Sequence, residues 1–170
     1  DTDGTPIKAY GIARDITAER RIQELYEREM KYLHSNSDES LLAKGHADLT
    51  KNLLLNYENG NASSRDNVER DMSYDESCAI LIAMISGEED QKRITKLMSR
   101  ENLIRRNQSG ETQTDFQFRK EIRGGNAKWI SVTVHTYTCP ETGDVELFSY
   151  AYDITEKMLL ETVMNCIAQD

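Results

Sequence analysis

The side chains that could do chemistry in this chain are few and scattered. They include three histidines, His34, His46 and His135, and three cysteines, Cys78, Cys139 and Cys166. No two cysteines have the short spacing of a zinc or redox motif, and an odd, scattered set fits a reducing compartment better than a disulfide framework. The sequence contains no phosphate-binding loop, no Gly-x-Ser-x-Gly turn and no close cluster of histidines and acids. It therefore predicts no catalytic residue, no metal site and no enzyme.

The densest group of carboxylates is Glu88-Glu89-Asp90. Such a group could serve in acid–base catalysis or hold a metal ion. It also stands directly before a helical stretch, where negative charge at the helix N-terminus is stabilising. We interpret the triplet as the N-terminal charge of that helix and keep catalysis as the alternative.

The elements that must position these side chains are clearest in residues 116–155. Three runs of alternating apolar and polar residues are separated by two turn signals, Gly124-Gly125-Asn126 and Pro140-Glu141-Thr142-Gly143. Runs bounded by such turns are typical of antiparallel strands joined as hairpins. After Asp153-Ile154-Thr155 the hydrophobic period changes from two to nearly four, which predicts that the last strand passes directly into a helix.

Four features of this stretch occur together. They are Phe116-Gln117-Phe118-Arg119, a Trp129 that begins the next strand, the Thr142-Gly143-Asp144-Val145 hairpin and the closing Asp153-Ile154-Thr155-Glu156-Lys157. In this combination the stretch resembles the C-terminal half of a PAS domain. The resemblance implies an α+β fold, with a five-stranded antiparallel sheet, helices on one face, and linker helices flanking the domain at both ends.

The chain also repeats itself. Residues 3–17 have the pattern of residues 143–155: a Gly turn, an alternating strand, then Asp-Ile-Thr followed by charged helix formers. The resemblance divides the chain into the terminal strand of a preceding PAS domain (1–17), a connecting signalling helix and linker (18–40), a PAS domain (41–155) and a C-terminal signalling helix (156–170). We expect the chain, which starts at Asp1 without a Met, to be a piece of a longer tandem protein. We expect the strand at 7–16 to join a sheet edge or a dimer contact.

Residues 18–35 are almost free of helix breakers and predict the first helix, with Thr17 or Asp15 as its N-cap. A seam of three- and four-residue spacing runs along it through Ile22, Leu25, Glu29 and Tyr32, with Leu33 beside it. Such a helix either lies on its own domain or forms a short parallel coiled coil between two chains. The charged Glu29 counts against the coiled coil.

Residues 42–61 are expected to supply the first two strands. Lys51-Asn52 is a natural turn between Leu49-Thr50 and the apolar run at 53–57. The run LTKNLLLNY is also compatible with a helix. The resemblance favours strands, because relatives commonly begin with a comparable stretch.

Two helical stretches follow. Residues 74–85 have Ser73 as a natural cap and Gly87 as a stop signal. Residues 91–108 carry an apolar face interrupted at Ser99, which indicates two segments rather than one straight helix.

The resemblance raises the question of a cofactor between the helices and the sheet. A haem ligand is usually a His on a helix, but His34 lies in the leading helix or its linker, His46 before the first strand and His135 on a strand. Flavin photosensors of this fold carry an Asn-Cys-Arg-Phe-Leu-Gln stretch. Cys78 stands instead in Glu76-Ser77-Cys78-Ala79-Ile80, and we interpret it as a small buried hydrophobe. We therefore expect no bound cofactor.

The alternation of the strands and the faces of the helices predict which side chains meet. Nine of them form the candidate core: Leu81, Ile82, Leu97, Met98, Phe116, Phe118, Ile130, Val132 and Val134. Ile122 continues the face of Phe116 and Phe118. These side chains either fill the core or line a pocket for an unknown small molecule. The opposite strand faces hold Trp129, His135, Tyr137, Phe148, Tyr150 and Tyr152, which we expect a flanking helix or a partner subunit to cover.

The composition of the chain argues against two classes of partner, nucleic acids and membranes. With 21 basic and 30 acidic side chains, the formal net charge is −9, which argues against nucleic-acid binding. No apolar run approaches the length of about 18 residues needed to span a bilayer, so we expect no membrane insertion and a cytoplasmic location.

The resemblance implies a non-enzymatic sensory or regulatory module of a bacterial-type signalling protein. Its output domain, of the diguanylate cyclase or histidine kinase type, would lie in the same polypeptide outside this chain. We expect a homodimer through the linker helices, and we expect Asp15, Thr17, Asp153, Ile154 and Thr155 to form the junctions that pass the signal. The alternative is a structural dimerisation spacer without a ligand.

Overall fold

The computed structural model describes residues 14–35, 39–59, 72–121 and 127–167. Five strands form one antiparallel sheet in the order β2-β1-β5-β4-β3. The strands are β1 (Leu41–Asp48), β2 (Leu53–Asn59), β3 (Gln113–Glu121), β4 (Ala127–Thr138) and β5 (Val145–Asp153). The helices are α1 (Thr17–His34), α2 (Tyr74–Ala83), α3 (Glu88–Met98), α4 (Arg100–Gln108) and α5 (Thr155–Ile167). The predicted α+β class and five-stranded antiparallel sheet are confirmed.

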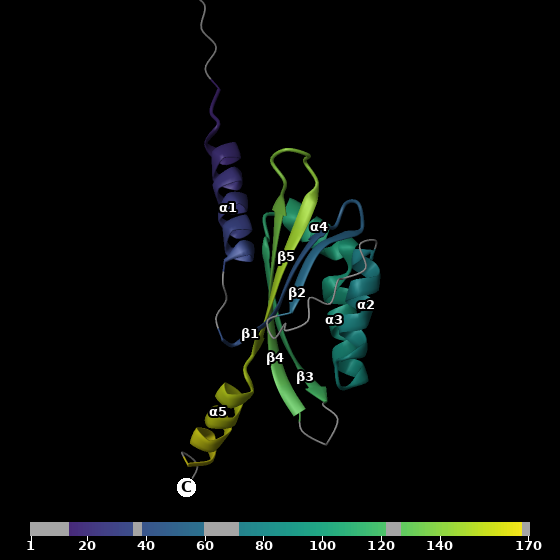
Figure 1. The fold of residues 1–170 in the computed structure, drawn as a ribbon, viewed down its shortest axis with the longest axis vertical. Helices are drawn as coiled ribbons and strands as arrows, with labels where there is room; N and C mark the ends of the chain where they lie inside the picture. The colour runs from purple at the N-terminus through teal and green to yellow at the C-terminus, as the bar shows by residue number, and fades with distance from the viewer. Residues whose placement is uncertain (1–13, 36–38, 60–71, 122–126, 168–170) are drawn as a thin grey trace, which may run out of the picture.

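The helices lie on both faces of this sheet. Helices α2, α3 and α4 cover one face, here called the inner face, while α1 lies along the opposite, outer face and α5 projects beyond the end of the sheet (Figure 1). The expectation of helices on one face therefore holds for the central helices. The linker helix α1 is itself packed on the domain, as the first of its two interpretations proposed.

Two buried clusters follow from this layering. The inner cluster joins the sheet to α2, α3 and α4 and includes Ile94, Leu103, Phe118 and Val134, all almost without exposure. The outer cluster lies under α1 and consists of Leu33, Leu41, Tyr137, Phe148 and Tyr150, with Leu25, Tyr26, Met30 and Tyr152 packed against it. The prediction that a flanking helix covers the outer aromatic residues is confirmed for Tyr137, Phe148, Tyr150 and Tyr152.

The two strands and the turn predicted for residues 42–61 are present, but the bounds of the first strand differ from the prediction. Asn52 has φ 57°, the left-handed conformation that an Asn tolerates in a tight turn. However, the first strand begins at Leu41 and ends at Asp48, so Leu49 and Thr50 belong to the turn. His46, predicted to precede this strand, lies inside it. At the next predicted turn, residues 122–126 lie outside the described residues and so do not test the placement of Ile122.

Two of the three central helices, α2 and α4, begin at a capping serine. Ser73 caps α2 and forms a reciprocal capping box with Glu76, as its sequence predicted. The helix ends at Ala83, and Gly87, predicted as its stop, is instead the N-cap of α3 with φ 96°. Ser99 ends α3 and caps α4 through the backbone N–H of Asn102, which confirms the two segments.

The N-terminal end of α1 differs from the prediction. The N-cap is Ile16 and no side chain caps the helix, because Thr17 is already its first residue. The Asp15 carboxylate accepts a hydrogen bond from the backbone N–H of Thr17 at 2.9 Å. Most of the strand predicted at 7–16 lies outside the described residues, and positions 14–16 are irregular. None of the helices in the described ranges is long and apolar enough to cross a membrane.

Candidate functional site

The inner face of the sheet has a floor of small side chains. On β1 these are Ala43, Gly45 and Ala47, and the register places the first two opposite Ala151 and Ser149 of β5. A Cβ atom added to Gly45 would lie 2.6 Å from the Ser149 Oγ, so the Ser149 side chain leaves no room for a side chain at position 45. Small residues on two neighbouring strands leave the helices standing away from the sheet.

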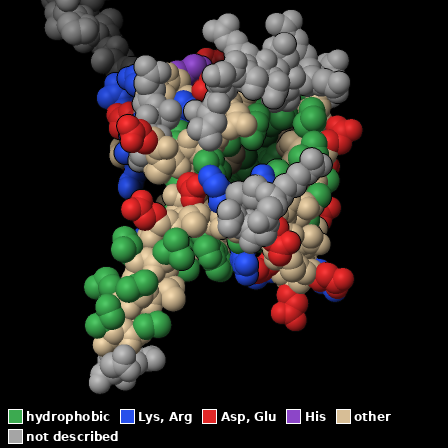
Figure 2. All heavy atoms as spheres, turned by 60° about the horizontal axis from the view of Figure 1, so that its bottom comes forward, with side chains coloured by type: hydrophobic (Ala, Val, Ile, Leu, Met, Phe, Trp, Pro, Cys, Tyr) green, Lys and Arg blue, Asp and Glu red, His purple; other side chains and the backbone are tan. Residues whose placement is uncertain are grey.

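The space left above this floor is a cavity of about 760 Å³. It lies between the inner face of the sheet and helix α2, and its size is typical of small-molecule sites. The larger apolar side chains that line it are Leu42, Leu54, Tyr57, Met72, Tyr74, Ile80, Leu81, Met84, Met98, Phe118, Ile130, Val132 and Leu147. Figure 2 shows hydrophobic side chains gathered in a hollow on this side of the molecule. A ligand here would meet a mainly apolar wall.

The nine predicted core or pocket residues divide into two groups. Five of them, Leu81, Met98, Phe118, Ile130 and Val132, line the cavity. The other four, Ile82, Leu97, Phe116 and Val134, belong to the inner cluster without lining the cavity. Both sequence interpretations, core and pocket lining, therefore describe part of the set.

A few polar groups interrupt the apolar wall. Ser149 lies at the centre of the floor, and its hydroxyl makes no hydrogen bond with the residues that the structure describes. Burial raises the pKa of the Tyr57 hydroxyl and of the Cys78 thiol. A thiol with a raised pKa stays protonated and is a poor nucleophile. Cys78 therefore offers this cavity a small neutral surface rather than a reactive group.

One end of the cavity adjoins the junction between β5 and α5. Asp153 Oδ1 accepts hydrogen bonds from the backbone N–H of Thr155 at 3.0 Å and from its hydroxyl at 2.6 Å. The other carboxylate oxygen lies 2.8 Å from the Nζ of Lys128. The Thr155 Oγ1 in turn accepts a hydrogen bond from the backbone N–H of Trp129 at 3.0 Å. Burial raises the pKa of Asp153, but Lys128 and Thr155 outweigh it and leave the pKa below its usual value.

Three of the five predicted junction residues, Asp153, Ile154 and Thr155, therefore lie together where β5 ends and α5 begins. Ile154 completes the contact, because its backbone N–H donates to the Trp129 carbonyl at 2.9 Å. The first Asp-Ile-Thr has the same local hydrogen bond, from Thr17 to Asp15. In the described residues Asp15 has no lysine partner corresponding to Lys128. The two junctions thus share the turn, and the ion pair is described only at the second.

A second group of polar residues, which sequence reasoning missed, is buried under α1. The Tyr26 hydroxyl donates to Glu146 Oε2 at 2.7 Å, and His46 Nε2 lies 2.6 Å from the same oxygen. Glu29 Oε1 lies 2.9 Å from His135 Nδ1. Each pair joins residues about 100 positions apart, so no local pattern in the sequence could have indicated it.

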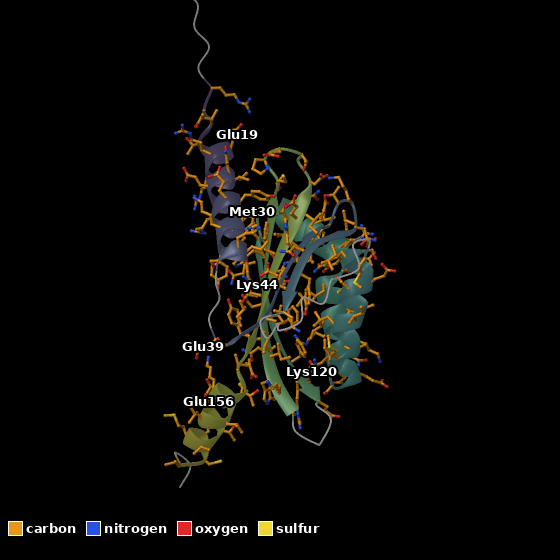
Figure 3. All side chains as sticks on the ribbon, in the orientation of Figure 1. Glu19, Met30, Glu39, Lys44, Lys120 and Glu156 are labelled. Carbon is orange, nitrogen blue, oxygen red and sulfur yellow. The ribbon has the colours of Figure 1, made fainter. Side chains whose placement is uncertain are left out.

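Lys44 anchors the end of the same helix. Its Nζ donates to the backbone carbonyl oxygens of Leu33 at 2.8 Å and Ser35 at 2.9 Å, which the end of α1 leaves without helical partners. Figure 3 shows Met30 and Lys44 between α1 and the sheet. Lys44, His46 and Asp48 alternate along β1 on its outer face and are buried there, although alternating polar residues are typical of a solvent-facing side of a strand.

These arrangements do not assemble a metal centre. Among the described residues no three His, Cys, Asp or Glu side chains are grouped to hold an ion. The two buried histidine–carboxylate pairs lie under α1, on the opposite face from the cavity. The cavity and the junction beside it are therefore the candidate functional site.

Comparison with known proteins gives structural neighbours only. No protein-family model matches the sequence, and no curated protein matches it. The structure resembles an RNA-binding light-oxygen-voltage receptor with a TM-score of 0.51 and 13% identity, over 96% of this chain and 41% of that one. It also resembles the N-terminal domain of a diguanylate cyclase with PAS/PAC sensor from Marinobacter aquaeolei, with a TM-score of 0.44 and 13% identity, over 68% and 97% of the two chains. A PAS domain of a two-component sensor histidine kinase matches with a TM-score of 0.39 and 12% identity, over 77% and 98%.

Proposed function

Because this chain has the PAS fold, we propose that it is a non-enzymatic sensory module that binds a small molecule and passes a signal through its flanking helices. The observation that carries the proposal is that the cavity and the β5–α5 junction share strand β4. Ile130 lines the cavity, and Trp129, its neighbour in the strand, bonds to Thr155 at the start of α5. A ligand that moves β4 would therefore move the first turn of α5.

The division of the chain is part of this proposal. Residues 41–155 would be the sensory domain and 156–170 the signalling helix that leads to the output domain. Residues 18–40 would connect it to a preceding PAS domain, of which residues 1–17 would be the terminal segment. The output domain, a diguanylate cyclase or a histidine kinase, is proposed from the sequence resemblance.

Helix α5 has the surface of a helix that meets another element. Its exposed hydrophobic side chains are Leu159, Leu160, Val163, Met164 and Ile167. Exposed apolar groups of this density mark an interaction site. We propose that α5 pairs with its copy in a homodimer, and that the signal travels as a change in the packing of this pair.

Binding is tested by thermal unfolding of the chain with a metabolite library, because a ligand that binds only the folded state raises Tm. Ser149→Leu places a large side chain on the cavity floor and should abolish the shift given by any hit. Ser131→Leu is the matched control, since Ser131 pairs with Tyr152 on the other face of the sheet. Equal binding by the two variants would place the ligand elsewhere.

Signal transfer is tested by two substitutions of Asp153 in the full-length protein. Asp153→Asn keeps an oxygen for Thr155 and removes the charge that pairs with Lys128, whereas Asp153→Ala removes both interactions. We expect both variants to lose ligand-dependent output. Only the alanine variant should also lose the hydrogen bonds with Thr155, at a cost of about 1 kcal/mol in the free energy of unfolding. Unchanged output and stability in both would remove Asp153 from the mechanism.

The second candidate function is a dimerisation spacer without a ligand, which the exposed apolar face of α5 also favours. It predicts a dimer by sedimentation that is lost in Leu160→Glu and Met164→Glu, together with no thermal shift from any compound. An output that responds to a cavity ligand would exclude the spacer.

A further inference from the structure

Two lysines lie side by side at the end of the cavity nearest the junction. Lys120 of β3 and Lys128 of β4 are direct partners in the sheet register, and both line the cavity. Like charges directly opposite each other in a sheet are destabilising. Figure 3 labels Lys120 near the end of β3, on the side of the sheet where the central helices lie.

The two lysines have fewer carboxylate partners than positive charges among the described residues. Lys128 has Asp153 as its partner at 2.8 Å, whereas the one described hydrogen-bond acceptor of Lys120 is the thioether sulfur of Met84, at 3.2 Å. Glu121 also lines the cavity but forms no ion pair with either lysine among the described residues. Among the described residues, only one of the two ammonium groups thus has a carboxylate partner, and that carboxylate is also bonded to Thr155.

A half-buried ammonium beside an apolar cavity is stabilised by an anion that brings its own apolar body. We propose that the cavity binds an anionic amphiphile of the medium-chain carboxylate class. Its chain occupies the space between α2 and the floor of small residues, and its carboxylate lies between Lys120 and Lys128. This inference rests on the proposed function, because it assigns a ligand class to the same cavity.

A head group in this position would allow the ligand to affect the start of helix α5. A carboxylate bound at Lys128 competes with Asp153 for the same ammonium group. The ion pair that helps to fix the Asp153 carboxylate is then weakened. Because the same carboxylate is hydrogen-bonded to Thr155, the start of α5 is perturbed. Trp129, the one tryptophan of the chain, lies between Lys128 and the bonded Thr155 and reports on this change by its fluorescence.

The test compares three probes with the same ten-carbon chain: decanoate and decyltrimethylammonium, each below its micelle concentration, and decan-1-ol below its solubility limit. Thermal unfolding and Trp129 fluorescence of the chain are measured in titrations. Decanoate should bind about tenfold or more tightly than the alcohol, since a hydrogen bond to a charged group is stronger than a neutral one. The cation should give no shift, and decanoate alone should change the Trp129 spectrum.

Substitutions locate the head group. Lys120→Met and Lys120→Gln should each reduce the affinity for decanoate to that for decan-1-ol. Lys96→Met is the matched control, because Lys96 is an exposed lysine of α3 outside the cavity lining, and it should change nothing. Two different substitutions of Lys120 are used because, if one of them impairs folding, the other still tests the position of the head group.

The outcomes separate this inference from the proposed function. Equal binding of acid and alcohol, or protection by library compounds that carry no negative charge, overturns the carboxylate assignment while a cavity ligand stands. A rise in Tm with an unchanged Trp129 spectrum overturns the coupling to the junction. Absence of any shift from the probes and from the whole library overturns the ligand-binding function itself.

Discussion

Replacing Glu146 by Gln tests the stabilisation that the buried polar residues give to α1. The carboxylate is 7% exposed, accepts a hydrogen bond from Tyr26 at 2.7 Å and lies 2.6 Å from His46 Nε2. Glutamine is almost the same size but uncharged, so two charge-assisted hydrogen bonds become neutral ones. A hydrogen bond to a charged group contributes about 1.5–3 kcal/mol and a neutral one about 0.5–1.5 kcal/mol. The difference, taken twice, predicts that the free energy of unfolding falls by about 2–3 kcal/mol.

Urea unfolding followed by circular dichroism measures this change, and the loss should lower Tm by about 6–9 °C for a chain of this size. Glu111→Gln is the control, because the Glu111 side chain, paired with Arg106, is 63% exposed, and a surface pair contributes about 0–1 kcal/mol. Hydrogen exchange should show that the amides around Tyr26 in α1 lose protection before those of the sheet. If Glu146→Gln and Glu111→Gln unfold with the same free energy, the reasoning from buried charge is refuted.

Three further predictions concern the core, a helix cap and pH. Leu103→Ala removes a side chain that is 1% exposed; urea unfolding should show a loss of about 2–5 kcal/mol, and a loss of less than about 1 kcal/mol would contradict its core position. Ser73→Ala breaks the capping box of α2 and should lower the free energy of unfolding by about 1 kcal/mol, whereas a wild-type value would show that the cap is not used. Burial raises the pKa of Glu29 and Glu146, but the hydrogen bonds with His135 and His46 outweigh it and leave both pKa values below the usual 4.5. The stabilisation that the two carboxylates give to the folded state is therefore complete above pH 4.5 and lost as the pH falls through their folded pKa values. Urea unfolding between about pH 5 and pH 3 should show a declining free energy of unfolding. A free energy that does not change over this range would contradict the lowered pKa values.

Local signals in the sequence were sufficient for the strands of residues 116–155, whereas at residues 42–61 the family resemblance decided between strand and helix. The alternation around Phe118, the turn at Asn52 and the cap at Ser73 each depend on a few neighbouring residues, and each lies in an element of the predicted type. The same local reasoning predicted that the last strand passes directly into a helix, as β5 does into α5.

What could not be predicted depends on contacts between distant residues. Glu29 was interpreted as a charge that weakens a helical seam, yet it is buried because His135 faces it across the α1–sheet interface. The cavity depends on small residues of β1 and β5 lying opposite each other, as Gly45 and Ser149 do. That pairing is set by the register of two strands about 100 residues apart, which the sequence of neither strand contains.

The central place of β5 in the sheet governs the order in which the chain can fold. The strand order β2-β1-β5-β4-β3 leaves two hairpins, β1–β2 and β3–β4, that are joined in the sheet through β5. During synthesis both hairpins emerge from the ribosome with one inner edge unpaired, and an isolated two-stranded hairpin is marginally stable in water. The sheet closes only after residue 153 has been made, which ties the assembly of the cavity to the last strand of the domain. The segment that completes the sheet is thus the same segment that leads into α5, so the cavity cannot be complete in a nascent chain before that segment is made.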